Sequence, residues 1–502
     1  MGQGGPVEGG PAGGDGSRKH RCERGLLDRR SQLDGYFCSY RGDMSDFREL
    51  LTYSASLIAD YREAVAERPV FPEVDFVDAR ANIGSLQNDS ISARAVVDEL
   101  VGVVEPMLVG STGPRYFGFV VGGSLDAATA ADMLTVGWDQ NAFNTVMSPG
   151  AAVIEEIAGG WIKELLGLPL QASFGFATGG QGANTVSLAA ARHFVLNKVG
   201  WDVEKDGLFG APRVRVVVTG ERHATIDTAL RVLGFGSNVA EPVLVNSQGA
   251  IDISDLTRVL ERGMQGPVIV CLQAGNVNTG AFDDFVRAIP IAHQHNAWVH
   301  VDGAFGLWAA ANPATRYLLE GVEQADSWAT DGHKWLNVPY DCGYALCAHP
   351  DAHHGATSYS APYLKGPEED EIRAPGDYVL ESSRRARGFA TWAALRQLGR
   401  TGIADLVEGC CALARRFADQ LASVEGVTVL NDVVLNQVLV RFGDEAQTDR
   451  VIRAIQRSGE CWMGATTWQG KRAMRISVSN WQTTEADVDR SVTAILDALS
   501  AK

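Results

Sequence analysis

Three features are scarce in this chain of 502 residues, and each scarcity excludes a class of function or site. No apolar run approaches the roughly 20 residues that span a bilayer, so no membrane partner is expected. Basic residues are outnumbered, giving a formal net charge of -17, which argues against nucleic acid because phosphate backbones select basic surfaces. The eight cysteines include no Cys-x-x-Cys pair. Neither a zinc site nor a disulfide framework is indicated, and a reducing cytoplasm is the simplest location.

The apolar pattern divides the chain into four parts. Residues 1–44 begin rich in glycine and are expected to be a disordered tail. Residues 45–109 form a helical arm, whose first helix has Ser45 as a plausible N-cap. In residues 110–381 strands alternate with helices, which predicts parallel crossovers and a sheet covered on both faces. Residues 382–502 predict a smaller α+β domain.

The strands expected in the large domain are short and rich in β-branched or aromatic residues. Functional side chains should gather where these strands end. The expected strands are Ser173–Thr178, Val214–Thr219, Val243–Val245, Val268–Leu272, Trp298–Asp302 and Tyr344–Cys347.

A lysine and an aspartate occupy positions that suit one cofactor. Lys334 lies in the run Asp331–Trp335, and Asp302 ends the run His300–Asp302. A lysine amine can form a Schiff base, and a carboxylate can hold a pyridine nitrogen protonated. Pyridoxal phosphate (PLP) needs both groups from a protein. Each residue alone also fits a structural role without a cofactor. Lys334 could be a surface lysine beside a packed indole, and Asp302 could belong to a capped strand end. Their combination favours the cofactor.

A glycine-rich segment and a histidine add to this pattern. The segment Gly179–Asn184 follows an expected strand and precedes a helix, so its backbone N–H groups can approach a phosphate. A plain tight turn is the alternative. His223 follows the next strand, where an imidazole could stack on a cofactor ring. No metal site is expected, because His223, His300 and His333 lack ligand spacing.

From about Leu50 to Leu499 the chain resembles the fold-type-I, group II PLP-dependent amino-acid decarboxylases, the group of aromatic-L-amino-acid and glutamate decarboxylases. Further landmarks are Gly113–Phe119 and Ser148-Pro149. The resemblance implies a homodimer and an α/β fold with a large, mostly parallel seven-stranded sheet, an N-terminal helical arm and a small C-terminal α+β domain. It implies that Gly180, Gln181, His223, Asp302, Ala304, Asp331, His333 and Lys334 bind PLP, that Lys334, Tyr363 and His223 act in catalysis, and that Phe143, Thr145 and Arg475 meet the substrate.

Two departures from the family pattern concern the substrate. Gly113 stands where the family has a histidine, and Val277 replaces a threonine that can lie near the cofactor. Thr145 lies where aromatic-substrate relatives often carry a bulky ring. No pocket for an indole or a catechol is therefore predicted.

The expected activity is decarboxylation of a small L-amino acid to its amine through a Lys334 Schiff base, a step of amino acid metabolism. Tyr363 resembles the tyrosine of the family's mobile catalytic loop, which delivers a proton after carbon dioxide leaves. A phenylalanine there would have indicated an aldehyde-forming relative. An aldehyde synthase, an aminotransferase or a carbon–carbon lyase on the same scaffold is the alternative. A non-catalytic PLP-binding or scaffold protein is the alternative from another class.

Overall fold

The computed structural model describes residues 44–83, 85–262, 266–359 and 373–501. Two compact units divide these residues. One contains 44–63 and 76–106, and the other contains 64–75 and 107–501. The expected tail, apart from Met44, and the loop with Tyr363 lie outside the described residues. Among the helices of the described ranges, none combines the length and the apolar character needed to cross a membrane.

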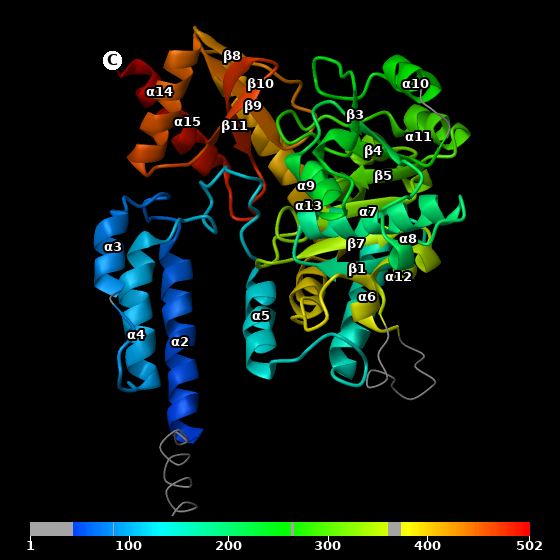
Figure 1. Ribbon diagram of the computed structural model, residues 1–502. Helices are drawn as coiled ribbons and strands as arrows, with labels where there is room; N and C mark the ends of the chain where they lie inside the picture. The colour runs from blue at the N-terminus through cyan, green and yellow to red at the C-terminus, as the bar shows by residue number, and fades with distance from the viewer. Residues whose placement is uncertain (1–43, 84, 263–265, 360–372, 502) are drawn as a thin grey trace, which may run out of the picture. The chain divides into compact units, whose positions relative to one another are not determined.

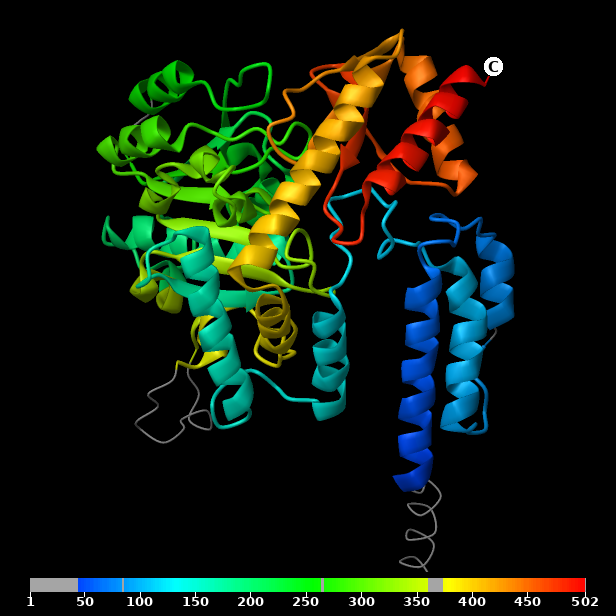
Figure 2. The same cartoon turned by 180° about the vertical axis from the view of Figure 1, so that it is seen from behind.

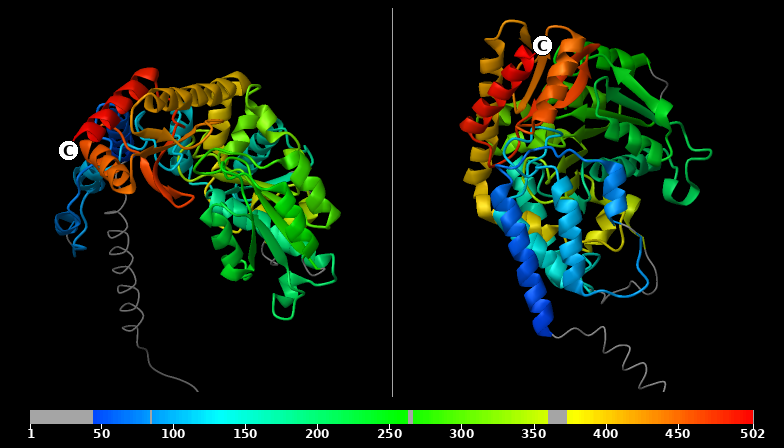
Figure 3. Two further views of the ribbon diagram at one scale, coloured as in Figure 1. Left: turned by 90° about the horizontal axis from the view of Figure 1, so that it is seen from above. Right: turned by 90° about the vertical axis from the view of Figure 1, so that its left-hand side faces the viewer.

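The first unit is helical. Helix α2 (Met44–Ala64) and helix α4 (Ala93–Val104) run side by side, with the short α3 (Phe76–Ile83) next to α4 (Figure 3). The Tyr53 hydroxyl on α2 donates a hydrogen bond of 2.8 Å to Asp98 on α4. Apolar side chains of these helices remain exposed, among them Phe47, Leu51, Ile58, Val96 and Leu100.

The second unit is built on a seven-stranded sheet in the order β1-β7-β6-β5-β4-β2-β3 (Figure 1). Only β7 runs antiparallel to its neighbours, so the other six strands end at one edge. The expectation of a large, mostly parallel seven-stranded sheet is confirmed. The strands are β1 (Ser173–Ala177), β2 (Arg215–Thr219), β3 (Ala240–Val243), β4 (Val268–Gln273), β5 (Trp298–Asp302), β6 (Ser327–Asp331) and β7 (Gly343–Cys347).

Helices surround this sheet and bury its apolar residues. The long helix α13 (Gly388–Ala422) packs on α5 and α6 and continues toward the C-terminal sheet (Figure 2). Its helical geometry breaks at Gly399, where φ is 60°, a value that glycine adopts at little cost. The other helices of this region are α5 (Asp126–Trp138), α6 (Pro149–Leu166), α7 (Gly180–Asn197), α8 (Val203–Asp206), α9 (Ala224–Val232), α10 (Ile253–Arg262), α11 (Phe285–Gln294) and α12 (Pro350–Thr357).

The C-terminal part forms a second, antiparallel sheet in the order β10-β11-β9-β8. Helix α15 begins with a capping box, in which Thr484 and Asp487 each bond to the other's backbone N–H. This α+β arrangement fits the small domain expected from the sequence. Its elements are β8 (Val427–Val429), β9 (Gln437–Phe442), α14 (Glu445–Ser458), β10 (Gly464–Trp468), β11 (Lys471–Ser477) and α15 (Glu485–Ser500).

Two local expectations need correction, and one strand was not expected. Ser45 is not an N-cap, because Met44 before it already has helical backbone. The strand expected at Val243–Val245 lies at Ala240–Val243, and Val245 makes only an isolated bridge. Strand β6 was not predicted as a strand, because its threonine, serine and aspartate give no continuous apolar run although every residue in it is buried.

A buried ion pair ties α6 to the chain that precedes α13. Glu155 Oε2 lies 2.9 Å from Arg384 Nη1, and their side chains are 1% and 0% exposed. The guanidinium also donates to the backbone oxygens of Ala142 and Phe176, both at 2.8 Å. Arg373 is a second, more distant partner, with its Nη2 3.6 Å from Glu155 Oε1. Removing Arg384 leaves the buried carboxylate with this weaker compensation, which costs stability.

We predict that Arg384→Gln lowers the free energy of unfolding by about 3–5 kcal/mol, measured by urea denaturation. The matched control is Arg400→Gln, because Arg400 pairs with Glu164 at an exposed position. The control should change stability by less than about 1 kcal/mol. Equal effects of the two substitutions would contradict a structural role for the buried pair.

Candidate active site

Lys334 lies in the turn that follows strand β6. Its Nζ is 3.0 Å from Asp331 Oδ2, and His333 Nε2 is 3.5 Å from Asp331 Oδ1. The Asp331 side chain is 2% exposed and that of Lys334 is 20% exposed. The strand end therefore presents a partly accessible amine, held by a carboxylate that water scarcely reaches.

The backbone around Lys334 is fixed by neighbours that were not predicted from the sequence. A Cβ at Gly122 would lie 1.7 Å from the Lys334 carbonyl oxygen, so only glycine fits there. The Asn337 amide donates to the carbonyls of Trp335 at 2.9 Å and Ser479 at 3.0 Å. For Asn337 the sequence gives only a weak signal, the residue type itself. Asparagine tolerates a positive φ, here 55°, better than most residues do.

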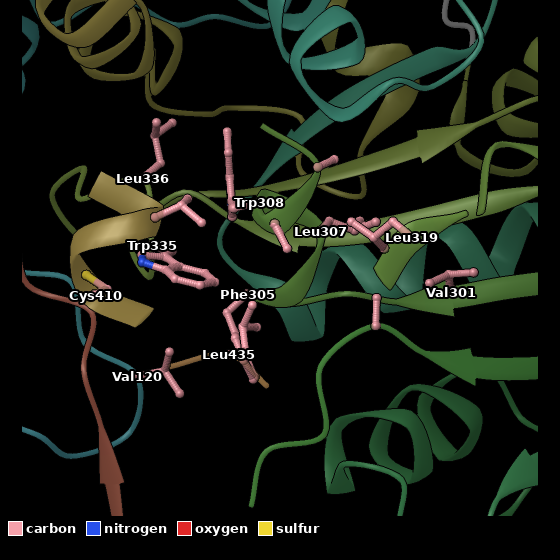
Figure 4. Packing of buried hydrophobic residues seen from close by; sticks show 14 of the residues in the cluster. Val120, Val301, Phe305, Leu307, Trp308, Leu319, Trp335, Leu336, Cys410 and Leu435 are labelled. Carbon is pink, nitrogen blue, oxygen red and sulfur yellow. The ribbon is translucent and has the colours of Figure 1, made fainter. Parts of the chain in front are cut away.

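Trp335 anchors the other side of Lys334. Trp335 is 1% exposed, and its indole ring lies near the Phe305 ring and the Cys410 side chain in the core (Figure 4). The Phe305 and Trp335 ring centroids are 6.4 Å apart. The indole that follows the lysine is thus a core residue that limits the movement of the turn.

Asp302 ends β5, the strand that pairs with β6. Its side chain is buried, and its Oδ1 has no hydrogen-bond partner among the described residues. Burial raises the pKa of Asp302, while the charges of His223 and Lys334 lower it. A carboxylate of this kind suits a ligand that brings its own proton, as a pyridinium nitrogen does. The neighbouring Ala304 carbonyl accepts the Asp331 N–H at 2.8 Å.

The turn between β1 and α7 passes directly against Asp331. A Cβ at Gly180 would lie 2.8 Å from Asp331 Oδ2. No side chain caps the N-terminus of α7, and Gln181 is exposed in its first turn. Backbone N–H groups at a helix start attract anions. The segment therefore fits a phosphate close to the Lys334 amine.

His223 is the N-cap of α9, and its Nδ1 accepts the Thr225 N–H at 3.3 Å. Desolvation lowers the pKa of His223, the charge of Asp302 raises it, and the charges of Lys334 and Arg475 lower it further. The structure thus brings His223, Asp302, Lys334 and Arg475 into one electrostatic group.

Arg475 lies on β11 of the C-terminal sheet, opposite Leu439 of β9. Burial lowers its pKa. Within the described ranges no acceptor lies within hydrogen-bonding distance of its guanidinium. A partly buried cation of this kind can bind a carboxylate with two parallel hydrogen bonds.

Three expected residues are not brought to this group by the described structure. Phe143 is buried, stacks on Tyr359 at 5.8 Å between ring centroids, and accepts the Gly376 N–H. Thr145 lies two residues further on, and its contact with substrate stays a prediction. Tyr363 lies outside the described residues.

The departure at Gly113 has a steric reason. A Cβ there would lie 3.2 Å from the carbonyl oxygens of Gly110 and Val65. Any larger side chain would therefore need these carbonyls to shift by a few tenths of an ångström, and glycine avoids this crowding.

Comparison with known proteins agrees with this geometry. Residues 83–442 match the pyridoxal-dependent decarboxylase conserved domain. Tyrosine decarboxylase 1 of Narcissus pseudonarcissus is 25% identical, covering 91% of this chain and 93% of the relative. The 4-hydroxyphenylacetaldehyde synthase of Rhodiola rosea is 27% identical, covering 88% and 94%. The crystal structure of Oryza sativa TDC with PLP and tryptamine superposes with a TM-score of 0.85 at 24% identity, covering 92% and 99%.

The match covers most of the chain, and the site has an open buried carboxylate, an accessible amine and an uncapped helix start, which together fit PLP. The protein is a PLP-dependent carboxy-lyase. It belongs to the pyridoxal-dependent decarboxylase family, as its sequence motifs predicted.

We predict that borohydride reduction of the PLP-loaded protein will attach the cofactor to the peptide containing Lys334, as detected by mass spectrometry. Lys334→Ala removes the amine and should abolish this label. Lys205→Ala is the control, because its ammonium is 80% exposed and pairs only with Asp202 in the described structure. A labelled peptide that persists in Lys334→Ala would show that another lysine holds the cofactor.

Proposed function

We propose that the protein decarboxylates an L-amino acid to the corresponding amine. The observation that carries this proposal is the open, buried oxygen of Asp302 close to the Lys334 amine. When bound, PLP supplies an electron sink into which the Cα–carboxylate bond can break.

Each residue near Lys334 has a defined task in this proposal. Lys334 would hold the cofactor and yield that place to the substrate amine, and Asp331 holds its Nζ at 3.0 Å. Asp302 would keep the pyridine nitrogen protonated, and the start of α7, with Gly180 and Gln181, would receive the phosphate. His223 would pack on the cofactor ring, while His333 and Ala304 set the position of Asp331. In the described structure the His333 ring bonds with the Cys342 N–H at 3.2 Å.

Arg475 is proposed to bind the substrate carboxylate. Its guanidinium lies close enough to His223 to lower that residue's pKa. A carboxylate bound by Arg475 would orient the bond that breaks, and bound substrate would offset the cost of burying the cation.

The side chain of the substrate is the least defined part of the proposal. The relatives named above are, by name, a tyrosine decarboxylase and a 4-hydroxyphenylacetaldehyde synthase, and one solved relative holds tryptamine. These names support an aromatic L-amino acid as the substrate to test first. A small amino acid, as expected from Thr145, is the alternative.

The active unit is proposed to be a homodimer located in the cytoplasm. Several large apolar residues are exposed on the described helices, including Leu51 at 50%, Leu100 at 59% and Trp138 at 53%. Large apolar side chains with this exposure are suited to burial against a second copy of the chain. Sedimentation velocity at assay concentration would reveal a monomer if the proposal is wrong.

An aldehyde synthase is the second candidate, because two relatives with that activity in their names are similar along most of this chain. The two functions share the loss of carbon dioxide and differ in what reaches Cα next. A proton gives the amine, whereas oxygen gives aldehyde, ammonia and peroxide. Tyr363 favours the amine, since a phenol can deliver the proton.

The test is to incubate PLP-loaded protein with tyrosine, tryptophan, glutamate and alanine, and to measure carbon dioxide, amine, ammonia and peroxide together. We predict carbon dioxide and amine in equal amounts from an aromatic substrate. Tyr363→Phe should lower amine formation about 10²-fold or more and release aldehyde with ammonia. Aldehyde as the main wild-type product would establish the synthase, and no carbon dioxide from any substrate would contradict both functions.

Arg475→Gln should raise KM about 10–100-fold, because a charge-assisted carboxylate contact is lost. Arg472→Gln on the same strand is the matched control, since Arg472 bonds Asp449 at 2.6 Å. Steady-state kinetics on the preferred substrate would measure both. An unchanged KM in Arg475→Gln would remove Arg475 from substrate binding.

A further inference from the structure

A chain of hydrogen bonds runs from the interior of the large domain to His223. Trp298 Nε1 donates to Ser327 Oγ at 2.9 Å, and Ser327 Oγ is 3.0 Å from His300 Nδ1. His300 Nε2 is 2.9 Å from Asn184 Oδ1. Asn184 Nδ2 donates to Thr225 Oγ1 at 3.3 Å, and Thr225 Oγ1 is 2.9 Å from His223 Nδ1.

The first four members of this chain are almost completely buried. Trp298 and Asn184 are each 1% exposed, and Ser327 and His300 are each 0% exposed. Water therefore does not compete for their hydrogen bonds, and each polar atom depends on its neighbour.

At the buried end, the indole nitrogen of Trp298 only donates, so Ser327 Oγ accepts from it. Burial lowers the pKa of His300 to about 3, so the ring is neutral and carries one proton. When Ser327 donates to Nδ1, that proton is on Nε2 and meets Asn184 Oδ1.

Asn184 lies between His300 and Thr225. Its NH₂ group donates to Thr225 Oγ1, and its oxygen lies against His300 Nε2. Asn184 also lies close enough to Asp302 to lower the pKa of that carboxyl.

At the far end of the chain, the Thr225 backbone N–H donates to His223 Nδ1 at 3.3 Å. This nitrogen therefore carries no proton in the neutral ring, and the Thr225 hydroxyl, 2.9 Å away, donates to it as well. A ring whose Nδ1 accepts twice carries its proton on Nε2 when it is neutral.

We propose that Asn184 is a positioning residue, which through Thr225 fixes the ring and the Nε2–H tautomer of His223. One buried side chain thereby holds the group assigned to the face of the cofactor ring. This consequence for catalysis rests on the proposed function. The hydrogen-bond chain itself does not.

The test uses nuclear magnetic resonance of full-length protein labelled with ¹⁵N-histidine, without added cofactor. Ring nitrogens with and without a proton have widely separated ¹⁵N shifts, and His223→Gln identifies the signals of His223. The wild type should show the proton on Nε2. Thr225→Ser keeps the hydroxyl and should preserve this pattern. Thr225→Val removes it, so the ring should exchange tautomers and the two shifts should move toward their average.

Asn184→Leu should have the same effect on His223 as Thr225→Val, although it does not touch that ring. A His223 proton on Nδ1 in the wild type would overturn the proposal. So would an unchanged His223 pattern in both Thr225→Val and Asn184→Leu. If Asn184→Leu does not fold, the two Thr225 variants still decide the outcome.

PLP affinity gives a second readout, measured by the quenching of tryptophan fluorescence. Thr225→Val should bind PLP about tenfold more weakly than Thr225→Ser, as the loss of one hydrogen bond implies. Equal affinities would show that the relay does not support the cofactor site. A protein that does not bind PLP at all would contradict the proposed function and leave the tautomer result standing.

Discussion

Parallel pairing of β5 with β6 brings together the two residues on which the site depends. Asp302 lies opposite Ala329, so Asp302 and Asp331 leave the sheet at the same edge. Lys334 follows Asp331 by three residues, and the pairing of their side chains keeps the amine at that edge. If β6 shifted by one residue along β5, side chains of β6 would exchange faces relative to β5, and Asp331 would no longer leave the sheet beside Asp302.

Electrostatics at this edge are balanced between two carboxylates and two cations. Asp302 and Asp331 are both buried, and Lys334 and Arg475 approach from the turn after β6 and from the C-terminal sheet. Burial alone would neutralise such groups, whereas each cation favours the charged form of its neighbours. A pyridinium would place a positive charge beside Asp302, and a substrate carboxylate would place a negative charge beside Arg475.

The sequence identifies site positions at which the chemistry allows few residue types. It does not identify positions at which only the backbone geometry restricts the residue type. Lys334, Asp302 and the glycine-rich turn could be recognised because few residues supply an amine, a carboxylate or a close backbone approach. Gly122 and Asn337 could not, because nothing local shows that the Lys334 carbonyl passes within contact of Gly122. Strand β6 was missed for a related reason: its polar residues are buried by tertiary contacts that no periodicity records.

The contacts of Asn337 have a consequence for how the chain can be shortened. Its amide bonds the Ser479 carbonyl at 3.0 Å, and its oxygen accepts the Trp481 N–H at 3.0 Å. Both partners lie beyond residue 442, where the match to the family domain ends. A fragment cut at that boundary would retain every residue assigned to PLP and still leave the turn of Lys334 unsupported. The residues beyond 442 therefore support the position of a lysine that lies far upstream in the sequence.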